Sequence, residues 1–409
     1  MTQGSASRRT QCCIAGGGPA GMMLGFLLAR SGVDVIVLEK HRDFFRDFRG
    51  DTIHPSTLEV MFELGLLDEF LKVPHQEIRR LSGQIGDTSI TIADFSHLPT
   101  RCKFLALMPQ WDFLNFLAER ARRYSGFHLE METQAVDLLG DGDRITGVRA
   151  LTNAGTIDIH ADLVVASDGR SSTIREKAGL RVEELGAPMD ILWFRMDRLP
   201  SDPGQALGRI DFGKILVMID RASYWQCGYV IAKGAFEHIQ ARGMDAFRKD
   251  IALLAPFMGA RLDELRDWND VKILTVAVNR LSTWYRPGLL CIGDAAHAMS
   301  PIGGVGINLA LQDAIATANV IAEPLGRGRL TLRDLAAVQR RRLFPTRVIQ
   351  TLQILIQSRI IGRVLGSSAH MSPPWPMRLL GRFPYLQRIP ARLVGLGVRP
   401  EHVRTPALR

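Results

Sequence analysis

Three glycines near the N-terminus have a spacing that could bind phosphate. Gly16, Gly18 and Gly21 form a G-x-G-x-x-G pattern after a short apolar run. In such a pattern the first glycine permits a tight turn, the second lets the backbone approach a pyrophosphate, and the third lets a helix pack closely on a strand. Glu39 ends the next apolar run, where its carboxylate could accept hydrogen bonds from a ribose diol. These residues predict a dinucleotide site, whose alternative is a glycine turn in an unrelated α/β unit.

Two further pairs of an acid and a glycine lie far along the chain. Asp168-Gly169 and Gly293-Asp294 each follow or end an apolar run that reads as a buried strand. Taken alone, each is an ordinary turn from a strand to a loop. Together with the first motif they predict three strand ends that surround one ligand at the carboxyl edge of a parallel sheet. The run Gly303 to Gly306 would then present backbone N–H groups at the beginning of a helix, whose dipole favours negative charge.

The elements that must position these residues alternate between strands and helices. Residues 12–39 predict strand, helix and strand, and Ser56-Thr57-Leu58-Glu59 matches a capping box that would begin a helix at Ser56. Apolar periodicity predicts the other elements. They are strands at 78–85 and 89–95, a helix at 111–120, three strands of a meander within 127–160, strands across 189–232 and near 271–278, and helices at 236–254, 308–323 and 331–365.

In this order the motifs resemble those of the class A FAD-dependent aromatic hydroxylases (monooxygenases), which have the p-hydroxybenzoate hydroxylase fold. The resemblance runs from Cys12 to about Arg342. It rests on the Gly16–Gly21 motif with Glu39, Arg49-Gly50, Gln110, Asp168-Gly169, and Gly293-Asp294 with Pro301 and the glycines that follow. It implies an α/β fold in which a Rossmann-like FAD-binding domain of the GR2 type carries an inserted β-sheet substrate domain and a helical C-terminus.

The resemblance implies FAD as the cofactor and NADH or NADPH as a transient reductant, because the sequence holds one dinucleotide motif. The Gly16–Glu39 segment would hold the ADP half, Asp294 the ribityl chain, and residues 301–308 the flavin ring. Arg49 has the alternative of a solvated loop arginine, and Gln110 that of a residue at a helix beginning. The implied cofactor-binding residues are Gly16, Gly18, Pro19, Ala20, Gly21, Glu39, Lys40, Arg49, Gln110, Asp168, Gly293, Asp294, Pro301, Gly303, Gly304, Val305, Gly306, Ile307 and Asn308.

The same resemblance divides the chain into six segments. Residues 1–77, 108–185 and 280–345 would form the FAD-binding domain. Residues 78–107 would add strands to the substrate domain, and residues 186–279 would form its main sheet. Residues 346–409 would be a helical C-terminal segment.

The implied reaction uses NAD(P)H and O₂ to hydroxylate a phenolic or polycyclic aromatic molecule through a flavin C4a-hydroperoxide. The sequence does not identify a catalytic residue or a metal site. Arg195, Arg209, Tyr224 and Tyr229 of the inserted sheet are available as a base or a phenolate partner. Their alternative is that the tyrosines pack within the sheet and the arginines lie at the surface.

Other proteins with this FAD fold stay open as alternatives. A quinone-precursor hydroxylase or a geranylgeranyl-reductase-like enzyme would act on a lipophilic substrate. Flavin-dependent halogenases carry a Trp-x-Trp-x-Ile-Pro element, which the six tryptophans here do not form. A non-enzyme alternative is a scaffold like the GDP-dissociation inhibitors, against which the intact glycine motifs argue.

Bulk composition limits the partners and the compartment. The net charge of +9 allows anionic ligands, but no nucleic-acid module is recognised, so no nucleic-acid partner is expected. Five cysteines without a C-x-x-C pattern favour reduced thiols and a cytoplasmic location. Arg8-Arg9 before an apolar run imitates an export signal, but that run carries the glycine motif, so we do not expect cleavage.

The C-terminal segment has two interpretations. Leu352, Ile354, Leu355, Ile360 and Ile361, interspersed with arginines, could form a basic amphipathic helix that contacts a membrane peripherally or covers the substrate entrance. More often such an apolar stripe packs on its own protein. The sequence allows a monomer or a homodimer.

Overall fold

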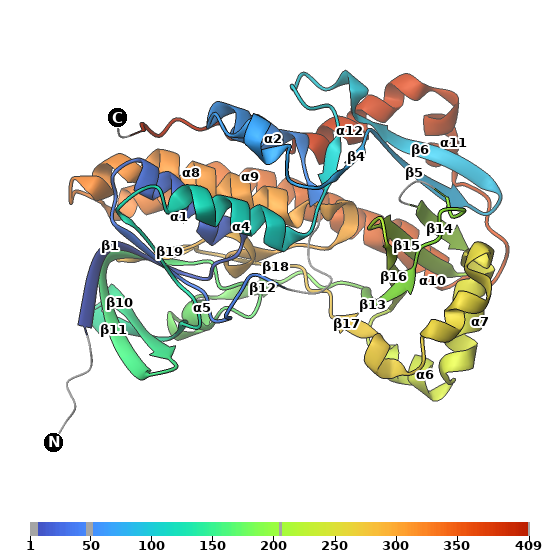
Figure 1. The fold of residues 1–409 in the computed structure, drawn as a ribbon, viewed down its shortest axis with the longest axis horizontal. Coiled ribbons are helices and arrows are strands. Elements are labelled where there is room, and N and C mark those ends of the chain that lie inside the picture. The colour runs from blue at the N-terminus through green and yellow to red at the C-terminus, as the bar shows by residue number, and fades with distance from the viewer. Residues whose placement is uncertain (1–6, 46–51, 204–206, 408–409) are drawn as a thin grey trace.

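The computed structural model describes residues 7–45, 52–203 and 207–407 (Figure 1). Its central element is an eight-stranded sheet in the order β19-β20-β11-β1-β2-β8, which β10 and β9 extend from β11. The pairs β20–β11, β11–β1, β1–β2 and β2–β8 are parallel. The strands are β1 (Ser7–Ala15), β2 (Val35–Leu38), β8 (Phe127–Glu130), β9 (Gln134–Asp141), β10 (Arg144–Thr152), β11 (Gly155–Ala166), β19 (Tyr285–Arg286) and β20 (Leu289–Cys291).

Long helices cover one face of this sheet (Figure 1). They are α1 (Pro19–Arg30), α4 (Gln110–Ala121), α8 (Gly306–Gly326) and α9 (Leu332–Ile356), and α1 packs on α4 and α8. Helix α1 is buried along nearly its whole length, in agreement with its run of methionine, leucine and phenylalanine. The segment Ile302–Gly326 is long and apolar enough to cross a membrane, but 78% of its apolar window is buried inside the protein. It is therefore packed as a core helix.

A second, seven-stranded sheet has the order β17-β13-β16-β15-β14-β5-β6. Strands β5 and β6 come from early in the chain, and β5 joins the later strands by parallel pairing with β14. Helices α6 (Phe236–Ala241) and α7 (Met244–Leu254) accompany this sheet. The strands are β5 (Arg80–Ile85), β6 (Thr88–Asp94), β13 (Met189–Asp197), β14 (Leu207–Asp211), β15 (Lys214–Asp220), β16 (Tyr224–Ala232) and β17 (Lys272–Leu274).

Short elements join the two sheets. Two three-stranded sheets have the orders β3-β7-β4 and β12-β18-β21. The helices α11 and α12 of the C-terminal segment pack on β6. The remaining elements are β3 (Thr52–Ile53), β4 (Gln76–Ile78), β7 (Leu105–Leu107), β12 (Val182–Glu184), β18 (Asn279–Leu281), β21 (His297–Ala298), α2 (Pro55–Glu63), α3 (Leu67–Phe70), α5 (Thr173–Lys177), α10 (Gly362–Leu365), α11 (Trp375–Arg382) and α12 (Arg388–Gly395).

Three local predictions were wrong. Ser56 does not cap a helix, because α2 already begins at Pro55, where a fixed φ suits the first helical position. The helix predicted over 236–254 is broken by Gly243, whose φ of +86° no other residue adopts easily. Of the strands predicted within 127–160, β8 joins the parallel sheet, and the meander consists of β9, β10 and β11.

The five cysteines are all buried and free. The stripe predicted in the C-terminal helix packs mostly on its own protein. Ile360, Ile361 and Val364 join the apolar cluster formed by β13, β15 and β16, whereas Leu355 is exposed.

Candidate functional site

The strand ends of the parallel sheet bring the distant motifs together. Ala15, the last residue of β1, pairs with Leu38 of β2 and with Ala166 of β11, and Ala166 pairs with Cys291 of β20. The residues that follow these strand ends therefore lie along one carboxyl edge. They are Gly16, Glu39, Ser167 and Ile292.

The glycine motif makes contacts that exclude side chains. Gly16 has a φ of +106°, and a Cβ atom there would lie 2.5 Å from the carbonyl oxygen of Ser167. A Cβ atom on Gly21 would lie 2.0 Å from the carbonyl oxygen of Gly16. Gly18 differs, because a Cβ atom on it would meet nothing within 4 Å. Gly16 and Gly21 thus serve the turn and the packing of α1, and Gly18 borders open space.

Glu39 is buried beside this turn. Its Oε2 accepts a hydrogen bond of 3.2 Å from the N–H of Gly17, and its Oε1 accepts one of 3.1 Å from the N–H of His41. The hydroxyl of Ser167 lies 2.9 Å from the carbonyl oxygen of Gly16 and ties β11 to the turn. Sequence reasoning missed Gly17 and Ser167. Their position in the sequence could have identified them, since each directly adjoins a motif residue.

Asp168 has a local structural partner. Its carboxylate accepts hydrogen bonds from the hydroxyl of Ser172 and from the N–H of Ile174, at the beginning of α5. Burial raises the pKa of Asp168, and these donors offset part of that rise. The carboxylate therefore caps α5 and holds the loop that follows β11.

The two acid–glycine motifs are joined by arginines. Arg170 lies 3.5 Å from the carboxylate of Asp294, which is about one third exposed. Arg175 donates to the carbonyl oxygens of Ala295, at 3.2 Å, and of Arg170, at 2.7 Å. Asp294 thus lies at the carboxyl edge with part of its carboxylate accessible.

Gly293 packs between helices α1 and α8. Its φ is +57°, and a Cβ atom on it would lie 3.3 Å from the Cβ atoms of both Ala20 in α1 and Ala310 in α8. Its N–H donates to Asp313 over 3.1 Å. This contact places the beginning of α1 beside α8, although the two helices lie far apart in the sequence.

The second glycine run forms a tight turn before α8. Gly303 and Gly304 have φ values of +77° and +63°, which favour glycine. The imidazole of His54 lies 3.0 Å from the carbonyl oxygen of Gly304 and 2.6 Å from that of Val394 in α12. Asn308 accepts a hydrogen bond of 2.7 Å from Ser56. His54 and Asn308 therefore connect the turn to α2 and to the C-terminal segment.

The beginnings of α1 and α8 fit the phosphates and the ring of FAD. No described side chain caps either helix, and the first turn of each lacks an acidic residue. An uncapped beginning leaves N–H groups and the positive end of the helix dipole for an anionic ligand. The beginning of α5 is occupied by Ser172 and Asp168. The structure thus distinguishes two available helix beginnings from one that is already capped.

A buried ionic cluster supports the turn that carries Asp294. Asp313 lies 2.6 Å from Nε2 of His297 and 2.9 Å from Nε of Arg342, and all three side chains are almost completely buried. Burial would raise the pKa of Asp313, but its interactions with His297 and Arg342 hold that pKa below its usual value. Glu401 lies 3.8 Å from Arg342 and pairs with Arg341 at 2.7 Å. Sequence reasoning missed this cluster, because its contacts join residues that are 16 to 60 positions apart.

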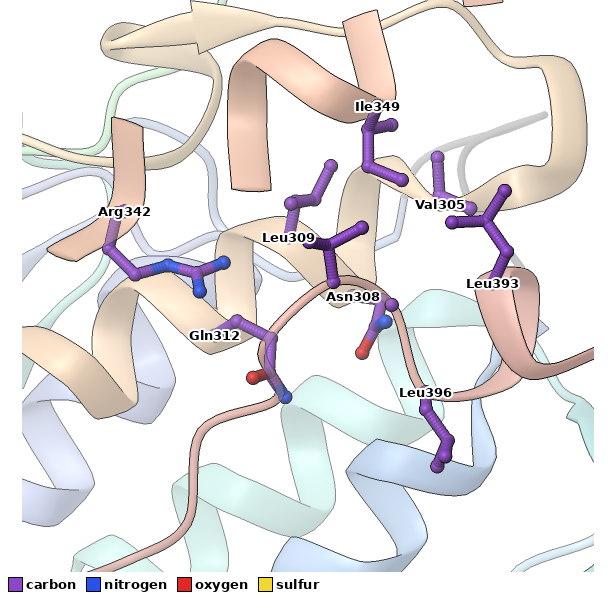
Figure 2. Close-up of a pocket in the computed structure, with 10 residues that line it drawn as sticks. Val305, Asn308, Leu309, Gln312, Arg342, Ile349, Leu393 and Leu396 are labelled. Atoms are coloured by element: carbon purple, nitrogen blue, oxygen red, sulfur yellow. The ribbon is translucent and has the colours of Figure 1, made fainter. Parts of the chain in front are cut away.

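A small cavity adjoins the beginning of α8 (Figure 2). It lies between α8, α9 and the end of α12, and its lining includes Asn308, Gln312, Arg342 and Leu393. The cavity has a water-accessible volume of about 10 Å³, which is room for about one water molecule. It is therefore too small for an organic ligand.

The four residues considered for catalysis lie on opposite faces of the second sheet, two on each face. Tyr229 packs 5.3 Å from the ring of Phe247 in α7, and burial beside Asp250 raises its pKa well above the usual value. Arg209 lies on the same α7 face, 5.9 Å from the ring of Phe257. By strand alternation Arg195 and Tyr224 lie on the opposite face, where they stack at 4.2 Å.

The turn at Gly303 and Gly304 contacts this opposite face. Ile302, which precedes Gly303, packs with the apolar cluster of Ile191, Ile215 and Val230. Trp193 belongs to the same cluster, and its ring lies 3.0 Å from the position of a Cβ atom on Gly228. Sequence reasoning missed Trp193, which strand alternation could have found.

The other predicted cofactor residues have different positions. Arg49 lies outside the described residues. Lys40 is exposed directly after Glu39. Gln110 is the first residue of α4, and its side chain forms no hydrogen bond within the described part of the chain. Pro301, Val305 and Ile307 belong to the turn and the first residues of α8.

Comparisons with known proteins agree with this geometry. A family model described as an FAD binding domain matches residues 9–351. The chain is 31% identical over 386 residues to 6-methylpretetramide 4-monooxygenase of Streptomyces rimosus, covering 94% of this chain and 92% of that protein. It is 23% identical over 346 residues to para-nitrophenol 4-monooxygenase of Pseudomonas sp. (strain WBC-3), covering 81% and 82%.

Solved structures share the fold. PqsL, a probable FAD-dependent monooxygenase from Pseudomonas aeruginosa, superimposes with a TM-score of 0.74 at 20% identity, covering 88% of this chain and 99% of that one. The p-nitrophenol 4-monooxygenase PnpA from Pseudomonas putida DLL-E4 has a TM-score of 0.74 at 19% identity, covering 96% and 100%. The expected p-hydroxybenzoate hydroxylase fold and the FAD cofactor are confirmed. The chain belongs to the class A FAD-dependent aromatic monooxygenases and is an enzyme of that family.

Proposed function

We propose that this enzyme hydroxylates a phenolic, polycyclic aromatic compound with NAD(P)H and O₂. The observation that carries the proposal is the convergence of four strand ends and two uncapped helix beginnings at one sheet edge. The polycyclic substrate class is supported by the relative that acts on 6-methylpretetramide and matches almost the whole chain.

In this proposal, different residues of the carboxyl edge bind different parts of the cofactor. The beginning of α1, with Gly18 open beside it, binds the pyrophosphate. Glu39 orients the turn and accepts from the ribose, and Asp294 binds the ribityl chain. The turn at Gly303 and Gly304 and the beginning of α8 border the ring. Asp168 acts by positioning its loop, because α5 already engages its carboxylate.

Bound FAD, reduced by NAD(P)H, supplies the chemistry that activates O₂ and transfers one oxygen atom to the substrate. The protein must bind and orient the aromatic ring and exclude water from it. The face of the second sheet that Ile302 contacts is the surface suited to this task, with Trp193 as an aromatic wall. We therefore assign residues 78–107 and 186–279 to substrate binding, residues 1–77, 108–185 and 280–345 to FAD binding, and residues 346–409 to a C-terminal segment.

The test is a substrate screen with purified protein that contains FAD. Phenolic polycycles, simple phenols, quinone precursors and an unsaturated prenyl lipid are added separately, and NADH and NADPH oxidation is followed beside the product mass. We expect a polycyclic phenol to accelerate NAD(P)H oxidation and to gain one oxygen atom. NAD(P)H oxidation that no phenol accelerates would contradict the proposal, as would a product without added oxygen. A reduced lipid product would support the geranylgeranyl-reductase-like alternative.

A further inference from the structure

The C-terminal segment exposes a group of large apolar side chains. Trp375, Ile389 and Tyr385 are 76%, 68% and 61% exposed, more than the other large apolar residues that the structure describes. Leu379 and Phe383, at 40% and 36%, lie in the same 15-residue stretch. Exposing so much apolar surface in water is unfavourable, and such patches mark contacts with other surfaces. We name these five residues and the arginines of the same stretch the C-terminal surface.

Folding does not require this exposed side of α11 and α12. Both helices contact β6, and on the inner side of α12 the buried residues Ala391 and Leu396 join Phe95 and Leu98 in an apolar cluster. Figure 1 shows both helices along an edge of the molecule, outside the β5–β6 hairpin. The exposed residues lie in both helices and in the segment between them, which holds Phe383 and Tyr385. They therefore form the outward side of this amphipathic region.

The charge of this segment is strongly one-sided. Residues 335–400 contain eleven arginines and no acidic residue or lysine, so the rest of the chain carries a net charge of −2 within the total of +9. Arg378, Arg382, Arg388 and Arg392 lie within or beside the C-terminal surface and are exposed. None of the four forms an ion pair with a described residue. The surface therefore combines unneutralised positive charge with exposed apolar and aromatic side chains.

We propose that the C-terminal surface docks on an anionic lipid bilayer. Arginines attract acidic headgroups, and tryptophan, tyrosine and aliphatic side chains on short amphipathic helices enter the boundary between headgroups and acyl chains. A second copy of the chain is disfavoured because it would bring equal positive charges together. Nucleic acid would use the arginines and rings but would leave Leu379 and Ile389 without an apolar partner. This docking is independent of the proposed hydroxylase activity.

The test uses the full-length protein loaded with FAD and two kinds of vesicle. One kind contains phosphatidylglycerol mixed with phosphatidylcholine, and the other contains phosphatidylcholine alone. We expect sedimentation with the anionic vesicles at low salt, and release at high salt because ions screen the attraction. The triple variant R382Q/R388Q/R392Q should bind about 100-fold more weakly. The double variant W375S/I389S should bind the anionic vesicles at least about tenfold more weakly than the unaltered protein, because it removes apolar contacts with the lipid.

Matched variants separate this surface from general effects. L151S/L253S removes two other exposed apolar residues, which are 48% and 56% exposed, and R122Q/R123Q/R333Q removes three exposed arginines elsewhere. Both controls should bind vesicles within about threefold of the unaltered protein, since electrostatic attraction falls off with distance from the lipid. FAD content should stay unchanged in every variant.

Four results would overturn the proposal. They are absence of binding to anionic vesicles, equal loss in the control variants, equally tight binding of duplex DNA that the same arginines control, and a dimer that W375S/I389S dissociates.

Discussion

Gly18 and Gly21 are three residues apart but have opposite surroundings. Gly21 has backbone oxygen and the Ser167 hydroxyl within contact distance of its missing Cβ atom, whereas Gly18 has open space. Both glycines belong to one sequence pattern. Their physical tasks are therefore separable: one allows the fold, and the other leaves room for a ligand.

Exchanging each glycine for alanine should separate these tasks. G18A should leave the melting temperature of the FAD-free protein within about 2 °C, because its φ of −73° suits alanine, but weaken FAD binding at least about tenfold. G21A should cost about 1–3 kcal/mol of stability through overpacking. Thermal unfolding without FAD and titration of flavin fluorescence measure both effects. Wild-type FAD affinity in G18A would contradict the assignment of the pyrophosphate.

His54 is a second residue whose chemistry depends on burial. Its two ring nitrogens face the carbonyl oxygens of Val394 and Gly304, yet a neutral imidazole can donate through only one nitrogen. Burial lowers the pKa of His54 below its usual value of 6.5, although both carbonyl contacts act in the opposite direction. The neutral form is therefore the one that the fold favours.

Acidification should therefore destabilise the enzyme through His54. Between the lowered pKa of the folded state and about 6.5 the unfolded chain binds more protons, so stability rises with pH in this window and falls on acidification. We expect H54Q to lose less stability than the wild type between pH 7 and pH 5 in urea unfolding. H238Q, at an exposed histidine of α6, is the control and should follow the wild type. Parallel curves for H54Q and the wild type would exclude this role.

At the scale of elements, α8 is the helix on which the site depends. Its beginning lies at the glycine turn, and Asp313, two turns later, holds the N–H of Gly293 and the side chains of His297 and Arg342. One buried carboxylate thus connects α8, α9 and the turn of Asp294. An ion in this position is costly to leave without its partner.

Removing this buried charge should be far more harmful than removing an exposed one. D313N is expected to cost about 3–5 kcal/mol of unfolding free energy, because it removes the nearer of the two carboxylates beside the buried Arg342 and leaves only Glu401, at 3.8 Å. E323Q breaks an exposed pair with Arg327 on the same helix and should cost less than about 1 kcal/mol. Urea unfolding of both variants gives the comparison. Equal costs would show that the buried cluster does not stabilise α8.

At the scale of the whole molecule, the turn at Gly303 and Gly304 meets one face of the second sheet among the described residues. Ile302 packs with Ile191 and Val230, and the face that carries Tyr229 packs on α7 instead. Strand alternation therefore decides which side chains can approach a substrate that lies between the two sheets.

Two tyrosine variants that each remove one hydroxyl test this arrangement. Y229F should leave kcat/KM within about threefold of the wild type, because its hydroxyl lies in the α7 core. Y224F, on the face that Ile302 contacts, should raise KM by more, about fivefold for a hydrogen bond of about 1 kcal/mol. Steady-state kinetics with the substrate from the screen measure both. A loss of about 100-fold in Y229F alone would place the reaction on the other face.

Much of the site could be predicted from the sequence because its motifs are local. The G-x-G-x-x-G turn, the acid–glycine pairs and the glycine run before α8 each need only neighbouring residues and a strand or helix, and periodicity predicts those elements. The FAD cofactor, the family and the inserted sheet were implied by the family resemblance that the motifs carry, and the comparisons confirm them.

Only the tertiary structure decided which of these residues are available to a ligand. It showed that Asp168 caps α5, that Gly18 borders open space, and that Tyr229 and Arg209 lie on the sheet face away from the turn at Gly303 and Gly304. It also revealed the cluster around Asp313 and the outward side of α11 and α12. These properties depend on contacts between residues far apart in the chain, and local patterns do not encode which distant surface a side chain meets.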